Sequence, residues 1–296
     1  MTRHILAATL TPFRTDGSLW LERIPDYLRF LIDRGVDGFL ALGTNGEFAS
    51  LSVEEREHVL EAHVAAARGR RVIVNVGTTV ARDVVRLARH AADADADGIA
   101  VLPPYYFPLT ERGFRDLVLS AADAFSGPVF LYNIPRYTGF SIPVSLVAAL
   151  AVDGTCIGIK DSSQDLDYLR RVREAAPDIE FLMGSDTTLV GGLAAGATGV
   201  ASGMANTFPD VVVGTTRAFE RGADLGAWEE RIREIRTAFA RFPYLAATRY
   251  AVAARGMDVG PVRAPLTDLT NEERDALVPE LSRILAGVDG LAVNET

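Results

Sequence analysis

The amino-acid sequence predicts an α/β fold, a (β/α)8 TIM barrel with a C-terminal helical extension. Short apolar runs alternate with longer helical patterns eight times between residues 5 and 221, which is typical of a parallel sheet covered by helices. The turn after the first run, Thr11-Pro12-Phe13-Arg14, lacks the Gly-x-Gly-x-x-Gly pattern of an open doubly wound sheet. After about residue 222 only helical patterns remain. A closed barrel followed by helices accounts for all three observations.

The predicted strands are short runs rich in β-branched and other apolar side chains. They cover residues 5–10, 38–42, 72–76, 98–102, 128–132, 155–160, 179–183 and 199–202. Each is followed by a segment with the spacing of an amphipathic helix. These helical segments cover residues 21–34, 52–67, 81–94, 111–124, 143–151, 166–175, 187–195 and 209–221. In the second of them, Ser52 and Glu55 have the spacing of a capping box.

The last part of the chain is expected to form three helices, over residues 225–242, 244–255 and 271–285. We therefore divide the chain into a barrel, residues 1–222, and a three-helix extension packed on it, residues 223–296. No low-complexity linker separates the two parts, so they are expected to fold as one unit.

Composition excludes several classes of function. The net charge is −9 with both signs interspersed, so the chain has no basic patch for nucleic acid. No apolar run approaches the roughly 20 residues of a membrane span. The N-terminus leads straight into a strand pattern, which indicates no signal peptide, and the single cysteine, Cys156, fits a reducing compartment. We expect a cytoplasmic globular protein.

Lys160 is the only lysine among 30 lysine and arginine residues. Arginine stays protonated, whereas a partly desolvated lysine amine can act as a nucleophile and form a Schiff base with a carbonyl substrate. Lys160 is predicted to be the last residue of the sixth strand. Alternation along that strand places it on the same face as Cys156 and Gly158, with Ile157 and Ile159 toward the helices. Lys160 is therefore predicted to point into the mouth of the barrel, where the active sites of such folds lie.

Two neighbouring strand ends carry further polar groups. Tyr132 ends the fifth strand, about 4.8 Å from the sixth, and its phenol could move protons, although a buried tyrosine can also be purely structural. The second strand ends in Gly43-Thr44-Asn45-Gly46-Glu47, a turn that suits an anion such as a carboxylate. After the seventh strand, Asp186 is predicted to cap the next helix or to bind substrate hydroxyls, and capping is favoured.

Other chemistries find no support in the sequence. His58 and His63 are five residues apart rather than the four that align two zinc ligands on a helix. The acidic stretch at 93–98 has Pro104 where a calcium loop requires glutamate. No Gly-x-Ser-x-Gly nucleophile elbow is present. We expect neither a metal nor an organic cofactor.

Nearly the whole chain resembles the dihydrodipicolinate synthase / N-acetylneuraminate lyase family of pyruvate-dependent class I aldolases. The resemblance rests on motifs in the family's order: Gly43-Thr44-Asn45-Gly46-Glu47, Pro104-Tyr105-Tyr106, Tyr132-Asn133-Ile134-Pro135 with Thr138-Gly139, Gly158-Ile159-Lys160-Asp161, and Gly184-Ser185-Asp186 with Gly196-Ala197-x-Gly199. It implies a 2-oxo acid substrate bound as an imine on Lys160, with Tyr132 as the proton donor and acceptor. It also implies a homotetramer built as a dimer of dimers.

The resemblance assigns roles to more residues. Besides Lys160 and Tyr132, the catalytic set it implies contains Thr44 and Tyr106, the latter reaching a neighbouring subunit's site to complete a proton relay. Thr44 and Asn45 would hold the substrate carboxylate. The full substrate-binding set is Gly43, Thr44, Asn45, Arg136, Tyr137, Gly184, Asp186, Ala201 and Gly203.

Two departures from the family pattern bear on the substrate. Tyr137 occupies the position at which true synthases carry an arginine for the aldehyde substrate's carboxylate, with Arg136 one residue earlier. Asn45 replaces the second threonine of their turn. Both favour a lyase that cleaves a 2-oxo-3-deoxy sugar acid or 4-hydroxy-2-oxo acid to pyruvate and an aldehyde. A synthase that condenses pyruvate with aspartate semialdehyde and a non-catalytic 2-oxo-acid-binding barrel stay open as alternatives.

Overall fold

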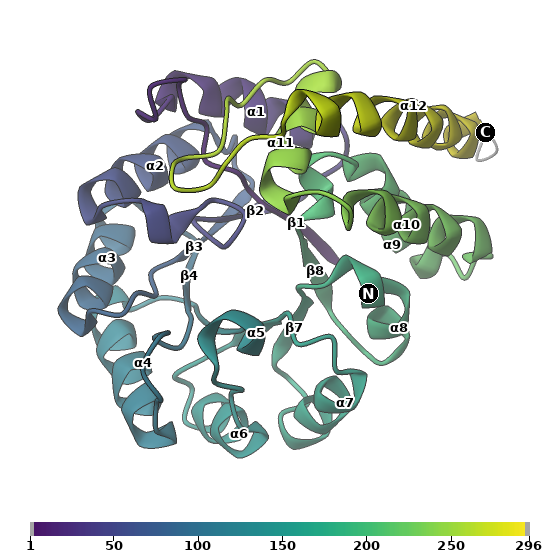
Figure 1. Ribbon diagram of the computed structural model, residues 1–296. Helices are drawn as coiled ribbons and strands as arrows, with labels where there is room; N and C mark the ends of the chain where they lie inside the picture. Colours follow the sequence, from purple (N-terminus) through teal and green to yellow (C-terminus); the bar gives the residue numbers. More distant parts are fainter. Residues whose placement is uncertain (1–2, 294–296) are drawn as a thin grey trace.

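Eight parallel strands close into a barrel in the computed structural model, which describes residues 3–293 (Figure 1). The strands are β1 (His4–Ala8), β2 (Gly38–Ala41), β3 (Arg71–Asn75), β4 (Gly98–Val101), β5 (Val129–Asn133), β6 (Gly158–Asp161), β7 (Glu180–Met183) and β8 (Gly199–Ser202). Each strand pairs with the next, and β8 pairs with β1. The predicted TIM barrel is confirmed.

Helices surround the barrel in the order that the alternation predicts (Figure 1). They are α1 (Ile24–Ile32), α2 (Val53–Ala66), α3 (Ala81–Asp93), α4 (Glu111–Phe125), α6 (Val144–Val152), α7 (Leu166–Ala175), α8 (Leu189–Ala194) and α9 (Pro209–Glu220). The capping box of α2 is present, because Ser52 accepts from Glu55 N–H and the Glu55 carboxylate accepts from Ser52 N–H.

The structure contains short elements that the periodicity did not distinguish from the helices and loops around them. The 3-10 turns are η1 (Leu21–Arg23), η2 (Phe48–Ser50), η3 (Asp186–Thr188) and η4 (Met204–Asn206), and a single helical turn forms α5 (Pro135–Thr138). Elements of three or four residues are too short for a periodic pattern to identify. Four of these five lie in loops after β2, β5, β7 and β8, where they shape the barrel mouth.

Strand register places the two central candidate residues side by side. Tyr132 on β5 is the direct partner of Lys160 on β6. Gly158 is needed on the same face of β6, because a Cβ there would lie 2.2 Å from the Phe130 ring. Two details of the prediction were wrong: β6 ends at Asp161 rather than Lys160, and Ile157 lies before the strand and is exposed. The inward direction of Lys160 does not depend on either detail.

Three more helices follow α9, namely α10 (Gly226–Phe239), α11 (Tyr244–Ala254) and α12 (Asn271–Val293). The predicted end of the last one, residue 285, was too early, because the helix continues past Pro279 to Val293. Trp228 of α10 packs so closely on α9 that a Cβ on Gly214 would lie 2.1 Å from its ring. The division of the chain at residue 222 stays a proposal.

None of the helices within residues 3–293 combines the length and the apolar character that crossing a bilayer requires.

Candidate active site

Lys160 lies buried at the end of β6, with 4% of its surface exposed. Its Nζ donates a hydrogen bond of 2.7 Å to Ser162 Oγ and lies 4.0 Å from the centroid of the Tyr132 ring. An amine at this depth needs polar partners, and the hydroxyl and the aromatic face supply them. Ser162 was not among the predicted site residues, although it follows Lys160 by only two positions.

Tyr132 connects the lysine to the turn after β2. Its hydroxyl lies 3.1 Å from Thr44 Oγ1, and the ring is 1% exposed. Burial raises the pKa of the Tyr132 phenol, but the charge of Lys160 and hydrogen bonding to Lys160 and Thr44 outweigh burial, so the net pKa lies below the ordinary value of 10.0. A phenol of lowered pKa beside an amine is suited to proton transfer.

Gly184 is the position after β7 that makes room for the lysine. A Cβ there would lie 2.5 Å from Lys160 Cε, 2.3 Å from Ser162 Oγ and 2.7 Å from Asp161 O. Only glycine fits without displacing these atoms. Gly184 therefore belongs to the site through close packing, which is how a glycine allows two segments to approach.

Gly203 and Asn45 lie against each other on the side of the barrel mouth formed by β8 and β2. A Cβ on Gly203 would lie 2.7 Å from Asn45 Nδ2 and 2.7 Å from the hydroxyl of Tyr244. Gly43 is also close to the centre, because a Cβ there would lie 3.9 Å from the Tyr132 hydroxyl. Tyr244, the first residue of α11, was missed because it lies 41 positions beyond Gly203 with no motif around it.

Asp186 does not cap the helix that follows it, and that prediction was wrong. Its buried carboxylate accepts hydrogen bonds from Ser202 Oγ and from Met204 N–H, 3.0 Å away, in the loop after β8. Burial raises the pKa of this carboxyl, and the hydrogen bonds oppose that effect. The side chain holds the β7 and β8 loops together, so Gly203 keeps its place beside Asn45.

The structure does not bring every predicted residue to Lys160. Tyr106 is 87% exposed and packs edge to face on Phe107, with 5.0 Å between ring centroids. Arg136 and Tyr137 are exposed on α5, where the guanidinium lies 5.6 Å from the Tyr137 ring centroid. Ala201 is buried within β8.

Asp161 is a further buried group that the sequence did not single out. Its carboxylate accepts from Asn133 Nδ2 at 2.7 Å and from Ser163 Oγ at 2.8 Å. Burial raises the pKa of Asp161 against these hydrogen bonds. Asn133 follows Tyr132 and Asp161 follows Lys160, so this pair ties together the two strand ends that carry the site.

Across residues 3–293, no three histidine, cysteine or acidic side chains gather in a way that could hold a metal ion.

Comparison with known proteins agrees with this geometry. A family model described as the dihydrodipicolinate synthetase family matches residues 1–284. An uncharacterised DapA-like lyase of Halobacterium salinarum is 38% identical over 94% of this chain and 92% of its own length. The 4-hydroxy-tetrahydrodipicolinate synthase of Methanothrix thermoacetophila is 33% identical over 96% and 97%.

A solved structure agrees as well. A variant of the 2-keto-3-deoxygluconate aldolase of Sulfolobus solfataricus superposes with a TM-score of 0.92 at 27% identity, over 98% of this chain and 99% of that one. The chain therefore belongs to the dihydrodipicolinate synthetase family, whose members are pyruvate-dependent class I lyases and aldolases.

Proposed function

We propose that this enzyme cleaves a 2-oxo-3-deoxy sugar acid or a 4-hydroxy-2-oxo acid to pyruvate and an aldehyde through an imine on Lys160. The observation that carries the proposal is the chain of contacts from Lys160 to Tyr132 and on to Thr44. It combines a buried amine with a phenol of lowered pKa, which are the two groups that imine chemistry needs.

The reaction follows from these groups. The unprotonated Nζ of Lys160 attacks the 2-oxo carbon. Tyr132 donates its phenolic proton to the departing hydroxyl, so loss of water leaves a protonated imine on Lys160 and a phenolate at Tyr132. Tyr132 accepts the proton of the 4-hydroxyl while the bond between C3 and C4 breaks, and the aldehyde leaves. The electron pair moves into the imine and forms an enamine. Tyr132 gives the proton of the 4-hydroxyl to C3 of the enamine, which restores the protonated imine. Hydrolysis then releases pyruvate and the free amine of Lys160, and the proton set free in this step returns to the Tyr132 phenolate.

The remaining polar groups serve binding in this proposal. The turn at Thr44 and Asn45 offers hydroxyl, amide and backbone N–H donors to the substrate carboxylate. Gly43, Gly184, Ala201 and Gly203 are small and leave space around the substrate. Asp186 acts indirectly, by holding the loop that contains Gly203. No metal or organic cofactor enters the reaction, because the protonated imine accepts the electrons.

The test is reductive trapping. Borohydride with pyruvate should add mass at Lys160, and Lys160→Arg should abolish both the adduct and the lyase activity while circular dichroism stays unchanged. A panel of 2-oxo sugar acids, read by pyruvate release, then identifies the substrate. Absence of an adduct in the unaltered protein would overturn the proposal. An adduct without turnover on any substrate would instead support a non-catalytic 2-oxo-acid-binding barrel.

The second candidate is 4-hydroxy-tetrahydrodipicolinate synthase, favoured by the similarity to a protein of that name. Arg136 is exposed and stacks on Tyr137, so its guanidinium is available to a second carboxylate. An assay with pyruvate and aspartate semialdehyde distinguishes the two functions. Arg136→Ala should reduce that activity strongly only if the second candidate is correct.

We further propose a cytoplasmic homotetramer, a dimer of dimers in which Tyr106 enters a neighbouring subunit's site. The support is the exposure of Tyr106 and Phe107, an aromatic pair of the kind enriched at protein interfaces. Tyr106 also has a positive φ of 84°, a conformation that a tyrosine rarely adopts. The cytoplasmic location rests on the single cysteine, which is free and buried.

A further inference from the structure

The turn that presents Thr44 is bounded by two residues in the left-handed region of backbone conformation. Leu42 has a φ of 57° and Glu47 a φ of 53°. Neither is glycine, so each conformation is unfavourable by itself and persists only where surrounding contacts impose it. Leu42 is held through its carbonyl, which accepts a hydrogen bond of 2.8 Å from Asn75 Nδ2. The contacts that hold Glu47 come from the other end of the chain.

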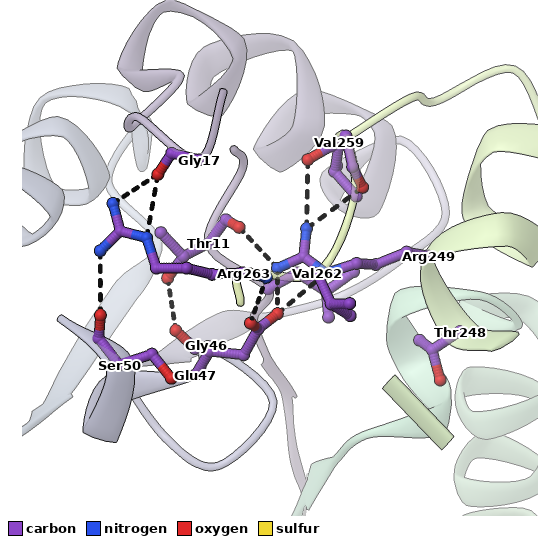
Figure 2. A network of polar contacts seen from close by, with 12 residues as sticks. Thr11, Gly17, Gly46, Glu47, Ser50, Thr248, Arg249, Val259, Val262 and Arg263 are labelled. Carbon is purple, nitrogen blue, oxygen red and sulfur yellow. Dashed lines mark hydrogen bonds and ion pairs between the residues drawn. The ribbon is translucent and has the colours of Figure 1, made fainter. Parts of the chain in front are cut away.

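The Glu47 carboxylate is completely buried and bound on both oxygens (Figure 2). Oε1 accepts from Arg249 Nε at 2.9 Å and Nη2 at 2.5 Å, and Oε2 accepts from Arg263 N–H at 3.0 Å. The Arg249 side chain is 2% exposed and also donates to Thr11 O at 2.8 Å and Val259 O at 3.1 Å. Both charges are therefore paired and hydrogen-bonded, as buried charges must be.

Contacts around Glu47 transmit this anchoring to Thr44. Glu47 N–H donates to Thr44 O at 3.1 Å. Thr11 Oγ1 donates to Gly46 O at 2.7 Å, and Thr11 O is itself a partner of Arg249. The turn is thus fastened at two successive residues, Gly46 and Glu47, to groups that Arg249 holds. Thr44, three residues before Glu47, then meets the Tyr132 hydroxyl.

We infer that Glu47 and Arg249 are positioning residues of the active site, which couple helix α11 of the extension to the turn that carries Thr44 and Asn45. Removing the ion pair releases the left-handed end of the turn and loosens the contact between Thr44 and Tyr132. The inference rests on the proposed function, because it assigns the turn a role in imine chemistry. The contrasting possibility is an ion pair that only stabilises the fold.

The test compares Glu47→Gln with a matched control, Asp210→Asn. Asp210 of α9 forms a bidentate ion pair with Arg255, the residue directly after α11, at 2.8 and 3.2 Å, and this pair also joins the extension to a barrel helix. The chemical change is the same in both variants, a carboxylate becoming an amide. We expect Glu47→Gln to lower the rate of pyruvate adduct formation at Lys160 by roughly 10- to 100-fold. Asp210→Asn should stay within about twofold, because its partners lie outside the turn.

A pH profile separates positioning from stability. Hydrogen bonding from Thr44 is one of the effects that lower the pKa of Tyr132. If Glu47→Gln loosens that contact, the limb of the rate profile that reports Tyr132 should move to higher pH. A variant that had merely lost stability would keep the limb in place. Arg249→Lys retains the positive charge but not the bidentate geometry of the guanidinium, so it should change the adduct rate and the pH limb less than Glu47→Gln does. It is the variant to measure if Glu47→Gln does not fold.

The outcomes distinguish the two proposals. If the unaltered protein forms no adduct, the proposed function fails, and hydrogen exchange of residues 42–50 in Glu47→Gln still reports whether the ion pair holds the turn. If the unaltered protein forms the adduct and Glu47→Gln matches its rate and pH profile, the positioning role is overturned. Faster exchange in the turn, a slower rate and a displaced limb together would establish it.

Discussion

Replacing Gly184 by alanine should impair the site through one methyl group. The added Cβ would lie 2.5 Å from Lys160 Cε and 2.3 Å from Ser162 Oγ. Both distances are shorter than 3.0 Å, and real Cβ atoms essentially never make contacts shorter than that. The lysine chain and the serine hydroxyl can rotate away, but Asp161 O, 2.7 Å distant, belongs to the backbone and cannot. The Lys160 side chain is therefore expected to move away from the added methyl group.

The size of the effect follows from the distance. Restoring ordinary contact displaces Lys160 Cε by about 1 Å, and a misplacement of that order costs roughly 100-fold in rate. Overpacking of this kind also lowers the free energy of unfolding by about 1–3 kcal/mol. The rate of borohydride-trapped adduct at Lys160, read by mass spectrometry, measures the first effect, and urea denaturation measures the second.

Gly226→Ala is the matched control, because a Cβ there would lie at ordinary contact, 3.6 and 3.7 Å from the Asp224 carboxylate. Gly226→Ala should leave the rate of adduct formation and the free energy of unfolding nearly unchanged. Adduct formation at the unaltered rate in a folded Gly184→Ala protein would refute the reasoning, since the position of Lys160 would then not depend on this packing.

Two further predictions concern acid stability and assembly. Burial lowers the pKa of His63 to about 4, below the 6.5 of an exposed imidazole. Only the unfolded chain therefore gains a proton as the pH falls from 6.5 to 4, and the free energy of unfolding should decrease by up to about 3 kcal/mol across that window. Urea denaturation should show this slope in the unaltered protein and a flatter one in His63→Gln, and equal slopes would contradict it. If Tyr106 serves a neighbouring subunit, Tyr106→Phe should be impaired, and its mixture with inactive Lys160→Arg, unfolded and refolded together, should exceed the sum of the separate activities. Simple additivity would place Tyr106 outside the neighbour's site.

The sequence by itself determined the barrel and the centre of the site. Alternation of apolar runs and helical patterns is a local property, and eight repeats of it leave few topologies. The period of two along a strand directed Lys160 inward, and consecutive strands in a barrel are neighbours, so Tyr132 had to lie beside it. In the structure Tyr132 and Lys160 are direct register partners, as this reasoning requires.

Only the tertiary structure decided the partners that lie far apart in the chain. Thr44 meets Tyr132 across 88 residues, and Glu47 meets Arg249 across 202. Asp186, which local spacing predicts as a helix cap, binds instead to Ser202 at the end of β8 and to Met204 in the loop after it. A local sequence pattern predicts which face of its strand or helix a side chain occupies. The hydrogen-bond partner of that side chain depends instead on how distant loops converge at the barrel mouth.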